Sequence, residues 1–388
     1  MATLRGYDRA WLRPDVVTGL VLATMLVPQG MAYAELTGLP AATGIYTTIA
    51  ALFAYSVFGP NRSLVLGPDS SLAPVIAAVV LPLAAQNRAE AVVLASAMSV
   101  LAGVACLISG YVKLGVITEL LSKPIRIGYL NGIAVLIFIS QVPKALGFSV
   151  EADSTVGTVL ETATGILDGL VDPASLAVGA SCVALIVVLN RVSRLKPGVV
   201  VAATASIVAV VLGLDVAVVG DIPRGLPPLT VPLPGIDVLP ELIGGALAVA
   251  LVSFADTGAL STATSLRSGE SVDPNSEIKA LGAANIVSGF FQGFATSASS
   301  TRTAVALSVG SRTQVAGLVA GGGVLLIVLA IPGLVSEMPE ATLAAIVITA
   351  AFALFDWQGW GWLLQVRRSE FLLSLGTALA VLFIGVLE

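Results

Sequence analysis

The chain has 388 residues, of which 56% are hydrophobic and only 11% are charged, and its formal net charge is −5. Ordinary soluble domains carry a charge on roughly a quarter of their residues, so this composition excludes a soluble globule and a disordered chain. The small negative charge provides no basic surface for nucleic acid. Long continuous apolar runs, rather than short alternating ones, indicate a helical membrane protein.

The sequence contains no histidine and two cysteines. The lack of histidine excludes histidine metal sites, Ser/His/Asp triads and histidine proton relays. Cys106 and Cys182 lie inside apolar runs, and we interpret them as small buried hydrophobic residues rather than as a disulfide. The sequence therefore predicts neither an enzyme nor a bound cofactor or metal centre.

Apolar runs between polar breaks predict thirteen membrane spans. In chain order they are 16–34, 41–58, 70–83, 90–110, 115–147 (broken near Pro124), 172–191, 197–214, 239–266, 276–291, 300–309, 313–333, 340–355 and 369–387. Two further segments are predicted to lie at the membrane interface. In 154–171 the apolar residues recur at three-to-four spacing, and 357–366 contains three tryptophans.

The distribution of basic residues predicts the orientation. With the N-terminus in the cytoplasm and alternating spans, 15 of the 19 lysines and arginines fall on the cytoplasmic side. Cytoplasmic segments of membrane proteins carry this excess of positive charge. We therefore expect a multi-pass protein of the inner (plasma) membrane with a cytoplasmic N-terminus.

Two of the predicted spans are too short to cross a bilayer. Residues 70–83 and 300–309 cover roughly 21 and 15 Å at about 1.5 Å per residue, whereas the hydrocarbon core is about 30 Å thick. They are third and tenth in order, each follows a non-helical stretch (63–68 and 294–298), and the pattern restarts near Leu239. Paired short spans at corresponding positions are typical of inverted-repeat transporters with interrupted helices.

The starts of these two short helices predict an anion site. A helix N-terminus presents unpaired N–H groups and a partial positive charge, and two such ends facing one another suit an anion. Small hydroxylated residues occupy both starts, namely Ser70, Ser71, Ser299, Ser300 and Thr301. Arg302 adds a full positive charge, which at bilayer depth requires a compensating anion or carboxylate.

At these residues the sequence resembles the SulP (sulfate permease, solute carrier family 26) anion transporters. The resemblance rests on three ordered motifs that extend over nearly the whole chain. They are Val27–Ala34 with Thr37–Pro40, Leu66–Ser71, and Asn285–Phe294 with Ser299–Val305. The resemblance implies an all-α, uracil-permease-like fold of seven plus seven inverted repeats. It also implies a fourteenth span and a C-terminal STAS domain, neither of which we identify in this chain.

The resemblance further implies two domains that slide past each other in an elevator-like motion. The core domain would comprise residues 1–112 (spans 1–4) and 237–334 (spans 8–11). The gate domain would comprise residues 113–236 (spans 5–7) and 335–388 (spans 12 and 13). The anion would move with the core.

The resemblance also implies the residues of the site. Substrate-binding positions would be Gln29, Tyr33, Asp69, Ser70, Ser71, Ser300, Thr301 and Arg302. Asp256 matches the position at which relatives carry an acidic residue linked to cation or proton coupling. From the residues themselves, a proton-driven cycle would have to neutralise Asp256, Asp69 or Glu35 on binding. If Na⁺ drives transport, its ligands would be Asp256, Thr257 and Ser261.

Five residues have more than one interpretation. Glu35 is either an exposed loop acid or a proton-coupling acid, and Gln29 either lines the pocket or makes a buried hydrogen bond between helices. Asp256 serves either coupling or pocket organisation, or it is a structural partner of Arg302. Asp69 is either the N-cap of the short helix 70–83 or a titrating group of the pocket. Arg302 either attracts the substrate or forms a structural pair with Asp256.

The predicted function is secondary transport of a small anion, such as sulfate, bicarbonate, chloride or a dicarboxylate, with co-transport of H⁺ or Na⁺. An anion channel, or a nucleobase or cation symporter on the same fold, is the alternative. The expected partners are the anion, the co-transported ion and membrane lipid, with no nucleic acid. A homodimer is compatible with the resemblance, although weakened without the C-terminal domain.

Overall fold

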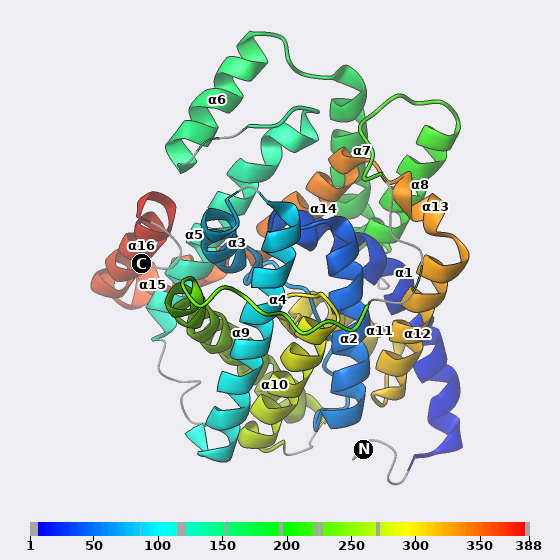
Figure 1. Ribbon diagram of the computed structural model, residues 1–388, viewed down its shortest axis with the longest axis vertical. Helices are drawn as coiled ribbons and strands as arrows, with labels where there is room; N and C mark the ends of the chain where they lie inside the picture. The colour runs from blue at the N-terminus through cyan, green and yellow to red at the C-terminus, as the bar shows by residue number, and fades with distance from the viewer. Residues whose placement is uncertain are drawn as a thin grey trace. The chain divides into compact units, whose positions relative to one another are not determined.

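The computed structural model describes the chain except residues 1–6, 86, 115–121, 151, 153, 194–196, 221–224, 226–227, 269–271 and 385–388. Its first half consists almost entirely of helices (Figure 1). The elements are the 3₁₀ helix η2 (Arg9–Trp11), α1 (Leu12–Leu36), α2 (Ala41–Phe58), strand β1 (Leu66–Gly67), α3 (Ala73–Leu83), α4 (Arg88–Tyr111), α5 (Lys123–Ala145), α6 (Thr155–Leu167), α7 (Pro173–Val192) and α8 (Gly198–Val211).

The second half repeats this order of elements. It contains α9 (Leu239–Ser268), α10 (Pro274–Phe290), strand β2 (Ser297–Ala298), α11 (Ser300–Val309), α12 (Val315–Ala330), α13 (Pro332–Ser336), α14 (Glu340–Leu354), α15 (Trp357–Val366) and α16 (Arg368–Phe383). In each half the third main helix is short and follows a two-residue strand: α3 has 11 residues and α11 has 10. The two short helices therefore occupy corresponding positions, as the sequence predicts.

The segment 357–366 forms a separate helix, α15, between α14 and α16. We expected it at the membrane interface because of its tryptophans, and so counted thirteen spans. With α15 included, the second half supplies seven main helices (α9–α12 and α14–α16), which matches the first (α1–α5, α7 and α8). Asp356 explains the break, because its carboxylate accepts the Gly359 N–H at 2.7 Å and starts a new helix.

Seven helical segments within the described residues are long and apolar enough to cross a membrane. Local sequence determines where several helices begin. Asn87, Asp172 and Asp273 each accept backbone N–H groups at the starts of α4, α7 and α10, as N-cap side chains do. Pro28 lies inside α1, where it removes one backbone donor from the helix.

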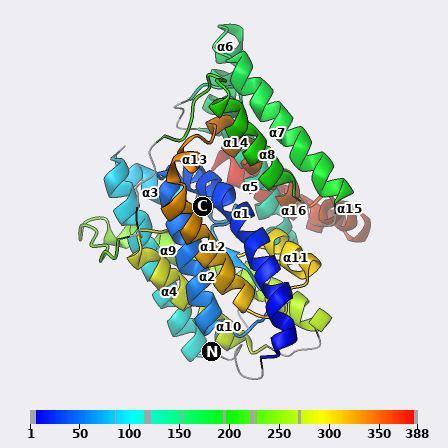
Figure 2. The same cartoon turned by 90° about the vertical axis from the view of Figure 1, so that its right-hand side faces the viewer.

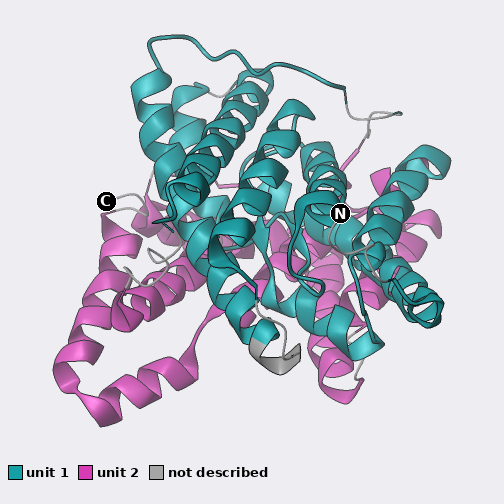
Figure 3. Cartoon of the chain, turned by 90° about the horizontal axis from the view of Figure 1, so that it is seen from below, with its two compact units in different colours: residues 1–120, 223–332 teal, residues 121–222, 333–388 magenta. Residues whose placement is uncertain are grey.

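The chain divides into two compact units (Figure 3). Unit 1 comprises residues 1–120 and 223–332, and unit 2 comprises residues 121–222 and 333–388. In unit 1, α10 packs along α4, and α1 packs on α2 and α12; Figure 2 shows α1, α2 and α12 side by side. In unit 2, α5 packs on α14 and α16, and α7 packs on α8 and α14.

Glycines allow the helices of unit 1 to approach closely. A Cβ placed on Gly44 of α2 would lie 1.8 Å from the carbonyl oxygen of Gly30 in α1. Likewise, a Cβ on Gly103 of α4 would lie 2.6 Å from the carbonyl oxygen of Gly282 in α10. Membrane helices use small residues in this way because packing, not hydrophobic burial, drives their association.

We expect Gly44→Ala to destabilise unit 1, because the methyl group would collide with the backbone of α1. Overpacking of this kind costs about 1–3 kcal/mol. The measurement is the apparent melting temperature of the purified protein in detergent. Gly322→Ala in α12 is the matched control, because a Cβ there meets no atom within 4 Å. Equal melting temperatures for the two variants would contradict the close approach of α1 and α2.

Candidate functional site

The two interrupted helices meet through their strands. β1 and β2 pair antiparallel, with Leu66 opposite Ala298 and Gly67 opposite Ser297. All four residues are buried. Non-helical backbone at membrane depth must satisfy its hydrogen bonds inside the protein, and this pairing does so. The antiparallel register also brings the segment leading into α3 beside the first turn of α11.

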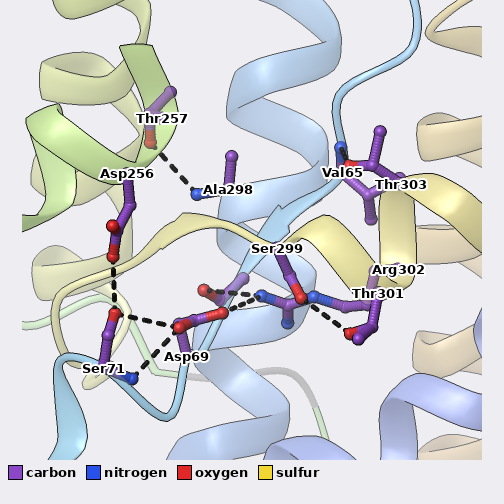
Figure 4. Close-up of polar contacts among 11 residues, drawn as sticks. Val65, Asp69, Ser71, Asp256, Thr257, Ala298, Ser299, Thr301, Arg302 and Thr303 are labelled. Atoms are coloured by element: carbon purple, nitrogen blue, oxygen red, sulfur yellow. Dashed lines mark hydrogen bonds and ion pairs between the residues drawn. The ribbon is translucent and has the colours of Figure 1, made fainter. Parts of the chain in front are cut away.

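Further hydrogen bonds hold the start of α11 in place. The Ser299 N–H donates to the Val65 carbonyl at 3.2 Å, and the Val65 N–H donates to the Thr303 hydroxyl at 3.2 Å. The Ala298 N–H donates to the hydroxyl of Thr257 in α9 at 3.1 Å. The second interrupted helix is therefore fixed both to the first and to α9 (Figure 4).

Arg302 lies in the first turn of α11 and is only 1% exposed. Its Nη2 lies 3.4 Å from the Asp69 Oδ2 atom and 3.4 Å from the Gly67 carbonyl oxygen. Its Nε and Nη1 atoms have no hydrogen-bond partner among the described residues. Gly67 is required for this arrangement, because a Cβ there would lie 2.8 Å from Nη1. A buried guanidinium thus retains unsatisfied donors.

A chain of polar contacts continues from Asp69 to α9. The Asp69 Oδ1 atom accepts the Ser71 N–H at 3.1 Å and lies 3.0 Å from the Ser71 hydroxyl. The same hydroxyl lies 2.8 Å from the Oδ2 atom of Asp256. Arg302, Asp69, Ser71 and Asp256 therefore form one connected group (Figure 4).

This geometry corrects two sequence interpretations. The ion pair of Arg302 is with Asp69 and not with Asp256, which contacts Ser71 instead. Asp69 is also not the N-cap of a helix that begins at residue 70. The helix α3 begins at Ala73 with Leu72 as its N-cap, and Asp69 caps the preceding turn. Pro68 and the Asp69 side chain favour a turn at this point.

Helix α1 contributes Gln29 and Tyr33, which are 7% and 6% exposed. Tyr33 lies close to Ser70, Asp69 and Arg302. The Oε1 atom of Gln29 is buried without a hydrogen-bond partner among the described residues. Pro28 adjoins this stretch of α1.

The remaining sequence-predicted residues differ in exposure. Ser300 and Thr301 are exposed at the start of α11, where the Thr301 hydroxyl contacts that of Ser299 at 3.0 Å. Glu35 is half-buried in the last turn of α1. The hydroxyl of Thr257 accepts from the β2 backbone.

Ser261, the last of the three predicted Na⁺ ligands, belongs to a buried network that the sequence does not reveal. Its hydroxyl donates to the Oε2 atom of Glu277 at 2.8 Å, and the hydroxyl of Tyr55 donates to Oε1 at 2.5 Å. Glu277 is 1% exposed. An acid in the first turn of a helix is ordinarily solvent-exposed, and only the packing of α2, α9 and α10 buries this one.

This network also holds the segment that leads into β1. The Asn61 side-chain amide donates to the hydroxyls of Ser261 and Thr264 at 3.1 and 2.9 Å. The Gln314 amide donates to the carbonyl oxygens of Asn61 and Leu64 at 2.9 and 2.8 Å. Two side-chain amides therefore fix the chain immediately before the strand that carries Gly67.

The site combines two helix starts, a buried guanidinium and small hydroxylated residues, on a fold with two interrupted helices. Interrupted helices at corresponding positions of two repeats are typical of inverted-repeat transporters. The sequence matches the Sulfate permease family over residues 12–377. The chain belongs to this family.

Among its relatives is "Probable sulfate transporter MT1781" of Mycobacterium tuberculosis, 40% identical over 386 residues, which cover 98% of this chain and 69% of the relative. Another is human "Solute carrier family 26 member 6", 33% identical, with 88% of this chain and 48% of that protein covered. The chain thus spans about half to two thirds of the length of these relatives. They are transporters, not enzymes.

Solved structures share the fold. The structure of SLC26A9 superimposes with a TM-score of 0.91 at 22% identity, covering 99% of this chain and 64% of that chain. The transmembrane domain of the cyanobacterial bicarbonate transporter BicA superimposes with a TM-score of 0.87 at 23% identity, covering 98% and 97%. The predicted family and the predicted seven-plus-seven helical fold are confirmed.

Arg302→Gln is expected to destabilise the protein, because it leaves Asp69 without its charged partner in a largely buried position. Breaking a buried ion pair from one side is more costly than removing both charges. Adding Asp69→Asn should therefore recover at least half of the lost apparent melting temperature. Purely additive losses in the double variant would show that the two side chains do not interact.

Proposed function

We propose that this protein is a secondary transporter of small anions that binds its substrate beside Arg302, between the starts of α3 and α11. The observation that carries the proposal is the burial of this guanidinium with Nε and Nη1 unpartnered. A buried charge with unsatisfied donors is costly, and an oxyanion would satisfy both. Sulfate is the first substrate to test, because the relative from M. tuberculosis is named a sulfate transporter.

The surrounding groups support this choice of ligand. Tyr33 and Gln29 from α1 provide polar atoms, and the helix starts provide N–H groups and partial positive charge. The carboxylate of Asp69 is negatively charged and would repel an anion, but it interacts with the same guanidinium of Arg302 that would bind the anion. A bound anion would compete with Asp69 for the guanidinium, so Asp69 would hold the empty site and release Arg302 to the substrate.

We propose that unit 1 is the moving core and unit 2 the gate. Every proposed binding and coupling residue lies in unit 1, in the ranges 29–71 and 256–302. An anion held by unit 1 would travel with it as it slides past unit 2, which is alternating access by an elevator-like motion. The orientation that we propose remains a cytoplasmic N-terminus in the plasma membrane, with a homodimer as the expected assembly.

We propose that the coupled ion is H⁺. The Ser71 hydroxyl lies within 3.0 Å of both Asp69 and Asp256, yet a hydroxyl carries one proton and can donate it to one acceptor. A proton on the carboxyl pair would supply the second hydrogen bond. Na⁺ is less favoured, because the hydroxyl of Ser261 is already bonded to Glu277 and that of Thr257 to Ala298.

A channel with the same site would pass anions without a saturable, gradient-driven accumulation. A nucleobase or cation symporter would need carboxylates directed at the substrate. Asp69 and Asp256 are engaged with Arg302 and Ser71 instead. These contacts favour an anion over a nucleobase or a cation as the substrate, and saturable, gradient-driven uptake is the measurement that separates a transporter from a channel.

Sulfate uptake into proteoliposomes tests the role of Arg302. We expect Arg302→Ala to raise the KM at least tenfold, because a charge-assisted contact contributes about 1.5–3 kcal/mol. Arg302→Lys retains the charge and should recover part of the loss. The control is Arg88→Ala, an exposed arginine at the start of α4. Unchanged uptake by Arg302→Ala would refute the site, and a panel of bicarbonate, chloride and dicarboxylates would then identify other substrates.

A second transport measurement tests the coupling. Asp256→Asn cannot release a proton, so accumulation driven by an inward pH gradient should be lost while exchange of labelled for unlabelled sulfate continues. Asp168→Asn, in an exposed acid that ends α6, is the control. Accumulation that persists in Asp256→Asn, or that follows a Na⁺ gradient instead, would rule out the proton on this pair.

A further inference from the structure

Unit 2 brings the starts of α5 and α16 and the end of α15 together. Helices α5 and α16 run parallel, because Gly128 packs on Ser374 and Gly132 packs on Ala378. Helix α15 runs the opposite way along α5. The Asp356 N–H donates to the Asn131 side chain, and the next turn of α15 packs one turn nearer the start of α5. The segment between α15 and α16 therefore lies near the start of α5 (Figure 1).

Basic side chains gather at this end. The Nζ atom of Lys123, the first residue of α5, lies 3.7 Å from the centre of the Trp362 ring in α15. Arg367, between α15 and α16, and Arg368, the first residue of α16, are both exposed. One acid, Glu370, lies in the first turn of α16. Lys123, Trp362, Arg367 and Arg368 are called the basic–tryptophan cluster below.

Apolar side chains adjoin this cluster. Leu364 and Val366 of α15 are 52% and 55% exposed, and Leu372 and Leu373 of α16 are 63% and 48% exposed. Trp362 itself is 44% exposed. The surface thus joins exposed positive charge directly to exposed aliphatic surface through a tryptophan. Tryptophan prefers the boundary between the headgroups and the hydrocarbon of a membrane.

We propose that the basic–tryptophan cluster is a binding site for an anionic phospholipid. The phosphodiester would contact Lys123, Arg367 and Arg368, and an acyl chain would lie along Leu364, Val366 and Leu373. This surface matches an amphiphile with a negatively charged headgroup, because its basic side chains adjoin exposed aliphatic side chains. A free oxyanion would contact only the basic side chains. The positive-inside pattern places the cluster at the cytoplasmic leaflet, where anionic lipids attract basic residues.

This site is separate from the proposed transport site, because it lies in unit 2 and shares no residue with the group around Arg302. The contact with the Trp362 ring also stabilises the position of Lys123, because the face of the ring attracts the ammonium group. It holds this group at the boundary between headgroups and hydrocarbon. The cluster would therefore give unit 2 a headgroup contact that does not depend on the anion carried by unit 1.

The test uses the purified full chain in dodecyl maltoside, titrated with dioleoyl phosphatidylglycerol or dioleoyl phosphatidylcholine. The readouts are the shift in melting temperature and the number of bound lipids in native mass spectra. We expect phosphatidylglycerol to bind at a lower concentration. The variant Lys123→Gln/Arg367→Gln/Arg368→Gln should bind it at least tenfold more weakly, because each basic residue contributes measurably to attraction by anionic lipid.

The charge-matched control is Arg9→Gln/Arg13→Gln/Arg191→Gln, which removes three exposed arginines elsewhere. It should bind phosphatidylglycerol like the original protein. Trp362→Leu keeps all three charges, and it too should weaken binding, which provides a second readout if the triple variant does not fold. Equal responses to the two lipids, an equal response to inorganic phosphate, or unchanged binding by both cluster variants would overturn the proposal.

Discussion

Buried backbone that is not helical must find hydrogen-bond partners inside the protein, and this requirement explains the centre of unit 1. Both interrupted helices leave two residues of extended chain, and each strand is the partner of the other. The pairing has consequences beyond the backbone. It positions Gly67, whose missing side chain leaves room for Arg302, and it brings Asp69 from one half of the chain to the first helical turn of the other.

The side chains around this pairing form two layers with different chemistry. The inner layer, from Arg302 through Asp69 and Ser71 to Asp256, joins charged side chains through one hydroxyl, and under the proposed function it is the part that rearranges when a proton or an anion arrives. The outer layer, from Glu277 and Tyr55 through Asn61 to Gln314, is fully engaged in holding the approach to β1. Under the proposed function, the group that binds the anion thus rests on a fully hydrogen-bonded support, which is how precise sites are ordinarily built.

The sequence was sufficient for the features that depend on length and hydrophobicity. The two short helices and their preceding extended stretches follow from run lengths and local residue types. Helix α11 begins at Ser300, where the predicted span 300–309 starts, whereas α3 begins at Ala73, after the predicted start at residue 70. The contacts between side chains were harder to predict from the sequence.

Arg302 could have paired with either Asp69 or Asp256, and the register between β1 and β2 decides between them. Glu277 was missed because its burial depends on three helices that are distant in sequence. The segment 357–366 was recognised by its tryptophans and has the bounds of α15, but it was not counted among the spans, so the seventh main helix of the second half was not predicted.

Gly67 and Arg302 are 235 positions apart in the chain. During synthesis, the first repeat would emerge with β1 lacking its partner strand and Asp69 lacking its cation, and both would have to wait until the second repeat followed. The centre of unit 1 can therefore be completed only after the second repeat has been made as far as Arg302. Until then, a membrane insertion factor or neighbouring helices must shelter an unpaired strand and a lone carboxylate from lipid.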